Sequence, residues 1–80
     1  MVGKSSAESE LQFGAALRRL RLAAGMSQER LGLEAGIQRN FVSLIETGQN
    51  QPTITTNAKL AKALGMRASE LVAEAERQTP

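Results

Sequence analysis

The sequence contains no cysteine and no histidine, and these two absences exclude several classes of protein. Without cysteine the chain can form no disulfide and offers no thiol nucleophile, and without either residue it cannot build the usual zinc sites. Imidazole acid-base catalysis is excluded as well. The 80 residues must fold by packing alone, as one domain near the size at which a monomer is only marginally stable. We therefore expect no metal, no cofactor, no small-molecule substrate and no enzymatic activity.

Long apolar runs are also absent. The longest are only a few residues, whereas a helix that spans a bilayer needs about 20. Residues 1–10 carry one basic residue, Lys4, and no apolar stretch, so they do not form a secretory signal. These features predict a cytoplasmic protein without membrane contact.

Basic residues gather in the middle of the chain. Residues 18–67 contain eight arginines and lysines against three glutamates, a net charge of +5, while residues 1–17 carry −1 and residues 68–80 carry −2. Charge alone does not choose between a solvated surface and a polyanionic partner. The motif described below lies within the basic segment, and that coincidence favours nucleic acid.

Apolar residues recur at the helical period and no segment alternates convincingly as a strand, so the sequence predicts an all-α fold with five helices. We expect the helices over residues 9–24, 28–35, 38–45, 53–65 and 68–77. Residues 1–8 are expected to form a flexible N-terminal arm, residues 9–77 the domain and residues 78–80 a tail.

Residues 27–46 read SQERLGLEAGIQRNFVSLIE, two short amphipathic segments joined at Gly36. Ser27 is a good N-cap for the first segment, and Gly36 suits a tight left-handed turn. In the second segment Phe41, Val42 and Ile45 mark a buried side and leave polar residues on the outer face. The pattern is typical of a helix-turn-helix, whose second helix enters the major groove of DNA.

On these residues the chain resembles the phage repressor and Cro-like helix-turn-helix proteins, the XRE family of bacterial regulators. The resemblance covers about residues 13–72, through FGAALRRLRLAAGMSQERLGLEAG, FVSLIETG and QPTITTNAKLAKALGMRASELV. It implies a compact, lambda-repressor-like domain that acts as a homodimer on a two-fold symmetric operator in double-stranded DNA. Small members of the family include the controller proteins of restriction-modification systems, and a controller role is our preferred specific hypothesis.

The outer face of the third helix is expected to read DNA bases. Positions 39, 40, 43 and 44 share a face opposite the buried side, and the residue before them lies at the helix start. The expected base-reading residues are Gln38, Arg39, Asn40, Ser43 and Leu44. Arginine can bind guanine, and asparagine adenine, through paired hydrogen bonds. Leu44 can contact a thymine methyl or remain a neutral exposed residue, and both readings stay open.

A second set of residues is expected to contact DNA phosphates: Arg18, Arg19, Ser27, Gln28, Gln49 and Asn50. Gln28 resembles the family's glutamine that clamps a phosphate beside a helix N-terminus, although it can also be simply a good first helical residue. Arg18 and Arg19 can equally face solvent. The loop that holds Gln49 and Asn50 is uncharged where relatives often carry lysine or arginine, which predicts a shallow salt dependence of binding.

The resemblance also implies a partly buried ion pair between Arg21 and Glu46 that holds the third helix at its angle. Three residues depart from the family pattern. Asn57 replaces a leucine and must find a hydrogen-bond partner or rotate its helix. Gly32 replaces an alanine, at a cost of up to about 1 kcal/mol in helix propensity. Arg67 is a poor cap for the fifth helix.

The dimer contact is expected from apolar residues of the fourth and fifth helices, with Leu71, Val72 and Ala75 as the candidates, unless all three only complete the monomer core. Activation of transcription would need a patch that faces RNA polymerase. Glu29 and Glu34 on the second helix are suggestive of such a patch, although repression is favoured for small proteins of this kind.

Two local features leave alternatives. The first helix can begin at a capping box of Ser5 with Glu8 or of Ser9 with Gln12. The competing function is an antitoxin-like or adaptor module that keeps the fold and binds protein without sequence-specific DNA binding. Leu44 on the outer face and the neutral loop support that alternative.

Overall fold

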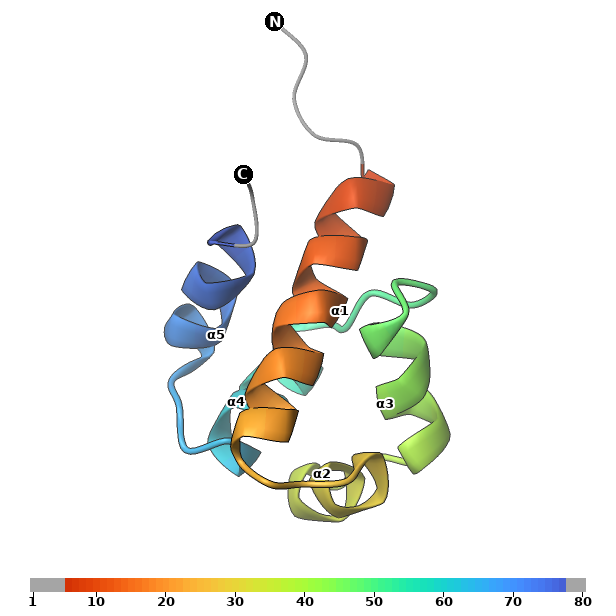
Figure 1. Cartoon of the computed structure of the whole chain (residues 1–80), viewed down its shortest axis with the longest axis vertical. Coiled ribbons are helices and arrows are strands. Elements are labelled where there is room, and N and C mark those ends of the chain that lie inside the picture. The colour runs from red at the N-terminus through yellow and green to blue at the C-terminus, as the bar shows by residue number, and fades with distance from the viewer. Residues whose placement is uncertain (1–5, 78–80) are drawn as a thin grey trace, which may run out of the picture.

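The computed structural model describes residues 6–77 of the chain, with side chains from Glu10 onward. Over that range it contains five helices and no strand (Figure 1), so the predicted all-α class is confirmed. The helices are α1 (Ser6–Ala23), α2 (Gln28–Ala35), α3 (Arg39–Glu46), α4 (Ile54–Ala63) and α5 (Ala68–Glu76). None of these five is long and apolar enough to cross a membrane.

Helix α1 begins before residue 9, the first residue of the predicted helix, and at the position where the alternative cap at Ser5 would start it. It starts at Ser6, so residues 6–8 are helical and do not belong to an arm. The rest of the predicted arm, residues 1–5, and the predicted tail, residues 78–80, lie outside the described residues. The side chains of Ser5, Glu8 and Ser9, on which both candidate capping boxes depend, also lie outside them.

Helix α2 has the predicted bounds because both of its ends are chemically marked. At its start the Ser27 hydroxyl oxygen accepts a hydrogen bond from the Arg30 backbone N–H at 3.0 Å. At its end Gly36 adopts the left-handed conformation with a φ of 74°, and its N–H donates to the Gly32 carbonyl. This turn leads the chain directly into α3.

Helix α1 runs through the middle of the fold, with α5 along one side and α3 along the other (Figure 1). One hydrophobic core joins all five helices. Its largest fully buried side chains are Leu17, Leu31, Val42, Ile45, Leu60 and Leu71. Because α1 contacts α3 and α4 contacts α2, the helix-turn-helix unit is supported from behind by the remaining helices.

Two glycines permit close backbone contacts around that unit. A Cβ atom on Gly14 of α1 would lie 2.4 Å from the Ile45 carbonyl oxygen at the end of α3. A Cβ atom on Gly32 would lie 2.7 Å from the Ile37 carbonyl oxygen in the turn. Gly32 is therefore required by the tight approach of the turn to α2, which explains its departure from the family's alanine.

The N-terminus of α5 is stabilised by the third residue of the helix and not by the side chain at the N-cap position. The Arg67 side chain makes no capping hydrogen bond, as its chemistry predicts. Instead the Glu70 side-chain oxygen accepts a hydrogen bond from the Arg67 backbone N–H at 2.8 Å. This is the half of a capping box that the third helical residue supplies, and it compensates for the poor cap.

Asn57 of α4 has an unsatisfied polar atom. Its Oδ1 oxygen is buried and has no hydrogen-bond partner within the described part of the chain. The sequence allowed two outcomes, a hydrogen-bond partner for the Asn57 side chain or a rotated helix. The first of these is not met for the side-chain oxygen. A buried acceptor without a donor destabilises the fold.

Replacing Asn57 with leucine is expected to raise the free energy of unfolding by about 1–3 kcal/mol, because the unsatisfied oxygen is removed and an apolar side chain takes its place. Urea denaturation measures the change. Asn40→Leu, at an exposed position of α3, is the matched control and should stay within about 0.5 kcal/mol of the parent. A loss of stability in Asn57→Leu would contradict the assignment of an unsatisfied oxygen.

Candidate nucleic-acid interface

Helix α3 has one buried side and one polar end. Val42 and Ile45 are fully buried against the core, while Gln38, Arg39 and Asn40 are exposed at its start. The two remaining base-reading candidates are less accessible, since Ser43 and Leu44 are each half-buried. The freely accessible polar surface is thus concentrated in the first turn of the helix and the residue before it.

That first turn lies next to the start of α2. Arg39 lines an open concavity of about 500 Å³ together with Ser27, Gln28, Glu29 and Arg21. The first backbone N–H groups of a helix have no partner within the helix, and the helix dipole places partial positive charge there. The structure therefore brings the leading base-reading candidate together with two of the phosphate candidates.

The ion pair between Arg21 and Glu46 is present and almost completely buried. Arg21 Nε donates to Glu46 Oε2 at 2.6 Å, and Arg21 Nη2 donates to Glu46 Oε1 at 3.0 Å. The two side chains are 9% and 3% exposed. Arg21 Nη1 also donates to the Met26 carbonyl at 2.9 Å, just before α2. The pair thus connects α1 both to the end of α3 and to the entry of α2.

Gln28 makes a contact that the sequence did not predict. Its side-chain Nε2 donates to Glu46 Oε1 at 3.1 Å in a partly buried site. Spacing along the chain gives no sign of this contact, because the two residues come from different helices.

The two arginines that precede Arg21 have different environments. Arg18 is exposed on α1. Arg19 Nη2 donates to Glu74 Oε1 at 2.6 Å, so it ties α1 to α5. Of the two, Arg18 is the more available for a phosphate, whereas Arg19 is engaged on the α5 side of the molecule.

The loop after α3 folds back onto the end of that helix. The backbone N–H groups of Gln49 and Asn50 both donate to the Leu44 carbonyl, at 2.9 and 3.2 Å. The Gln49 side-chain Nε2 donates to the Thr47 hydroxyl oxygen at 2.9 Å. Gly48 permits this geometry with a φ of 79°. The loop is therefore ordered by its own hydrogen bonds and carries no charged side chain.

The predicted dimer residues need correction. Leu71 is fully buried and Ala75 nearly so, because both face the core of their own chain, and only Val72 is exposed, at 43%. The alternative that they complete the monomer core therefore holds for Leu71 and Ala75. The amphipathic pattern of α5 could not distinguish a stripe that meets its own core from one that meets a partner.

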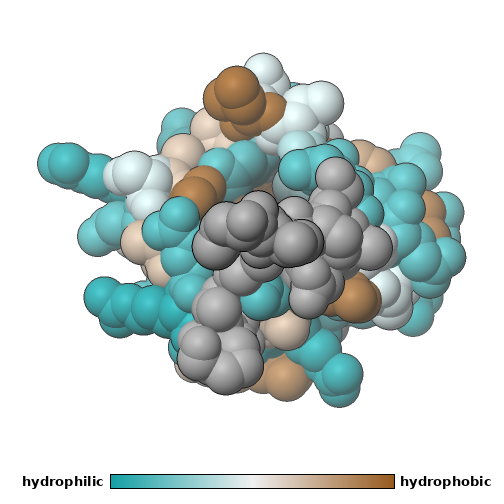
Figure 2. Space-filling model, turned by 90° about the horizontal axis from the view of Figure 1, so that it is seen from above, coloured by the Kyte–Doolittle hydropathy of each residue, from teal (hydrophilic) through white to brown (hydrophobic). Residues whose placement is uncertain are grey.

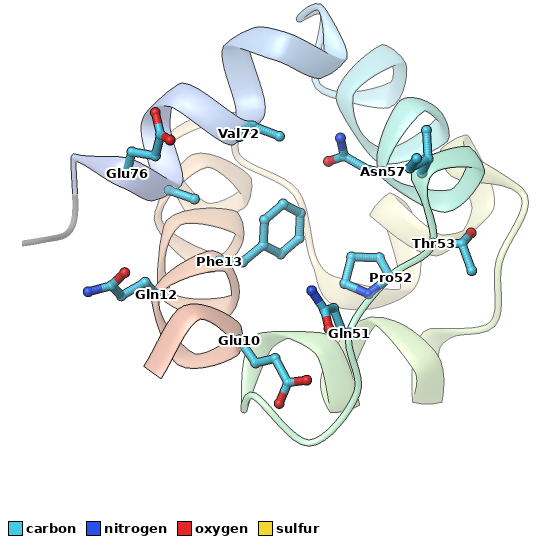
Figure 3. Close-up of a pocket in the computed structure, with 11 residues that line it drawn as sticks. Glu10, Gln12, Phe13, Gln51, Pro52, Thr53, Asn57, Val72 and Glu76 are labelled. Carbon is cyan, nitrogen blue, oxygen red and sulfur yellow. The ribbon is translucent and has the colours of Figure 1, made fainter. Parts of the chain in front are cut away.

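Val72 borders an apolar groove of about 420 Å³ between α1, α4 and α5. Figure 3 shows the Phe13 ring projecting from α1 into the space between Val72 and Asn57, with Pro52 beside it. Ile54, at the start of α4, also lines the groove and is 88% exposed. In the coloured part of Figure 2, hydrophilic residues predominate and the strongly hydrophobic ones appear as separate small patches.

Comparison with known proteins agrees with this geometry. A family model described as a helix-turn-helix domain matches residues 12–75, most of the chain. The control protein C.BamHI of Bacillus amyloliquefaciens is 36% identical over 63 residues, which cover 78% of each chain. An uncharacterized HTH-type transcriptional regulator, y4dJ of Sinorhizobium fredii, is 36% identical over 67 residues, which cover 84% of this chain and 86% of the relative.

Among solved structures, the restriction-modification controller protein C.AhdI of Aeromonas hydrophila superposes with a TM-score of 0.76 and 40% sequence identity. The match covers 78% of this chain and 94% of the controller. The predicted family resemblance is thereby confirmed in both sequence and structure. The chain belongs to the helix-turn-helix domain family.

Proposed function

We propose that this protein is a sequence-specific, non-enzymatic DNA-binding transcriptional regulator that binds a two-fold symmetric operator as a homodimer. One observation carries the proposal: the exposed first turn of α3 lies beside the N-terminus of α2. Hydrogen bonds among Arg21, Gln28 and Glu46 connect the two helices behind this surface. An α-helix fits the major groove, where all four base pairs can be distinguished. The similarity to C.BamHI and C.AhdI favours a restriction-modification controller as the specific role, acting in the cytoplasm.

Arg39 and Asn40 are the proposed base-reading residues, because they are exposed and carry side chains suited to guanine and adenine. Gln38, one residue earlier, can reach a base or a phosphate. Ser43 and Leu44 contribute less in this proposal, since each is half-buried. The burial of Leu44 also weakens the adaptor alternative, which relied on an exposed leucine at this position.

Phosphate contacts are proposed at the start of α2 and along the flanking segments. Ser27 and Gln28 offer backbone and side-chain donors at the positive end of the helix. Arg18 adds a charged contact, while Gln49 and Asn50 can offer only neutral ones. Because each neutralised phosphate contributes about 0.9 to the slope of log affinity against log salt, we expect a slope of small magnitude.

A titration of a duplex against protein at several salt concentrations tests DNA binding in general. Selection from a random duplex pool then tests sequence specificity. An enriched motif with two-fold symmetry supports the proposal, whereas an absence of enrichment even at low salt would favour the adaptor alternative.

Contact with RNA polymerase, through Glu29 and Glu34 of α2, would be required only if the protein activates transcription.

The homodimer contact is proposed at the groove bordered by Val72. Ile54 projects from the same face on which the groove opens, so a protruding side chain and a complementary hollow lie side by side. Around a two-fold axis such a surface is self-complementary, since Ile54 of each copy can enter the groove of the other. Ile54 was not among the predicted dimer residues, because the sequence predicts it on the packed face of the fourth helix. That prediction is wrong, since Ile54 stands at the first position of α4 and is 88% exposed.

Ile54→Ser is expected to raise the dimer dissociation constant at least about 100-fold, because two isoleucine side chains lose their burial, each worth about 1.5 kcal/mol or more. Leu33→Ser is the matched control, since Leu33 is 74% exposed on α2 and does not line the groove. Sedimentation equilibrium measures both variants. Equal dissociation constants for the two variants would contradict this interface.

A further inference from the structure

We infer that Glu46 has a second role in addition to its ion pair with Arg21: it orients the side-chain amide of Gln28 toward a DNA phosphate. Glu46 is then a positioning residue for phosphate binding at α2, although it touches no DNA itself. This inference rests on the proposed function, in which Gln28 meets a phosphate.

The Glu46 carboxylate stands where three elements meet. It closes α3, its Oε1 oxygen accepts hydrogen bonds from both Arg21 Nη2 and Gln28 Nε2, at 3.0 and 3.1 Å, and Arg21 in turn binds the Met26 carbonyl. The carboxylate side chain is 3% exposed. One nearly buried group at the end of α3 therefore contacts the Gln28 amide directly and the α2 entry through Arg21.

The chemistry of the amide determines which way Gln28 faces. A carboxamide is planar and offers two N–H donors on one side and an oxygen on the other. The oxygen would be repelled by the Glu46 carboxylate, so the NH₂ group must face it. One N–H is then committed to Glu46, and the second remains available to an acceptor. Gln28 lines the open concavity beside α2 together with Ser27 and Arg39, which is where that acceptor can enter.

The ion pair also makes this arrangement compatible with an anion. An isolated carboxylate near the phosphate would repel it, but Glu46 is paired with Arg21 through two hydrogen bonds.

A free glutamine side chain would lose rotamer freedom on binding DNA, and such ordering weakens association. A glutamine already held by Glu46 has lost that freedom on folding, so its phosphate contact forms with a smaller entropic cost.

The alternative is that the Gln28 contact only satisfies a buried polar group. To separate the two, the acceptor must be removed without unfolding the protein. Arg21→Met with Glu46→Met does so, because replacing both members of a buried ion pair with apolar residues is often neutral or stabilising. Gln28→Met leaves the ion pair intact and removes only the amide.

The first measurement is made on the free protein. In the parent, NMR relaxation should show the Gln28 side-chain amide to be as rigid as the backbone of α2, and the double methionine variant should release it. Gln49 is the control, because its amide binds the Thr47 hydroxyl oxygen in an exposed loop and should not change. A Gln28 amide that is already mobile in the parent would overturn the inference without any use of DNA.

The second measurement is the affinity for a 20-base-pair duplex of mixed sequence at low salt. We expect Gln28→Met to weaken binding about tenfold, the size typical of a hydrogen bond to a charged group. The double methionine variant should weaken it about threefold to tenfold, and should have less than about a twofold effect when Gln28→Met is already present. This non-additivity is the signature of a role that acts through Gln28.

Additive effects of Gln28→Met and the double methionine variant would overturn the inference and leave the proposed function intact. A loss with the double variant but none with Gln28→Met would likewise assign Glu46 a purely structural role. If the parent protein binds no duplex, the proposed function fails and the phosphate role fails with it. The NMR measurement still reports separately whether Glu46 holds Gln28.

Discussion

Replacing Arg21 with methionine is expected to lower the free energy of unfolding by about 3–5 kcal/mol, the usual effect of removing one partner from a buried ion pair. Glu46 would keep the Gln28 donor but lose both hydrogen bonds from the guanidinium, and its buried charge would be uncompensated. The Met26 carbonyl would lose a donor as well. Urea denaturation followed by circular dichroism measures the change.

The matched control for Arg21→Met adds a second substitution, Glu46→Met. With both charges gone the desolvation cost disappears, and stability should return to within about 1 kcal/mol of the parent or exceed it. Arg19→Met provides a comparison on the same helix, because the exposed pair of Arg19 with Glu74 should be worth no more than about 1 kcal/mol. Similar losses of unfolding free energy for Arg21→Met and Arg19→Met would contradict the expectation that breaking the buried pair costs more than breaking the exposed one.

Replacing Gly14 with alanine is expected to destabilise the protein by about 3 kcal/mol, at the upper end of ordinary overpacking. The added Cβ would lie 2.4 and 2.6 Å from the backbone carbonyl oxygens of Ile45 and Glu46. These are backbone atoms and cannot rotate away, so α3 must move relative to α1. Thermal or urea denaturation measures the loss, and weaker DNA binding should accompany it because the recognition helix is displaced.

The sign of the stability change in Gly14→Ala distinguishes a close helix contact from an unhindered helix position. In an unhindered helix interior, alanine would stabilise by about 1 kcal/mol relative to glycine. A gain of stability would therefore contradict the close approach of α1 to α3. Ala15→Gly, at an exposed neighbouring position, controls for helix propensity and should cost about 1 kcal/mol.

Local signals were sufficient to predict much of the fold. Ser27 and Gly36 mark the ends of α2 by capping chemistry, and the apolar periodicity identifies Val42 and Ile45 as the buried side of α3. The Arg21–Glu46 pair was predicted from the family resemblance. The two residues lie 25 positions apart on different helices, so no local sequence pattern indicates their contact. In each case the prediction depended either on adjacent residues or on a known pattern.

The features that the sequence left undecided share a physical reason, because each depends on how the helices meet in space. The burial of Leu71 and Ala75 follows from the side of α5 that faces α1, which periodicity alone does not identify. The engagement of Arg19 with Glu74 has the same origin. The close approaches at Gly14 and Gly32 are also tertiary contacts, so the sequence alone showed Gly32 only as a weak helix former and gave no sign of the role of Gly14.

Selection from a random duplex pool, with the parent protein and with Arg39→Ala, tests directly whether the first turn of α3 reads DNA sequence. The parent protein should enrich a motif with two-fold symmetry. Arg39→Ala should then relax the preference at one symmetry-related position of each half-site, by about 1–3 kcal/mol, and leave the other positions unchanged. No enrichment with the parent, or an Arg39→Ala motif identical to the parent's at every position, would contradict direct reading of sequence by this turn.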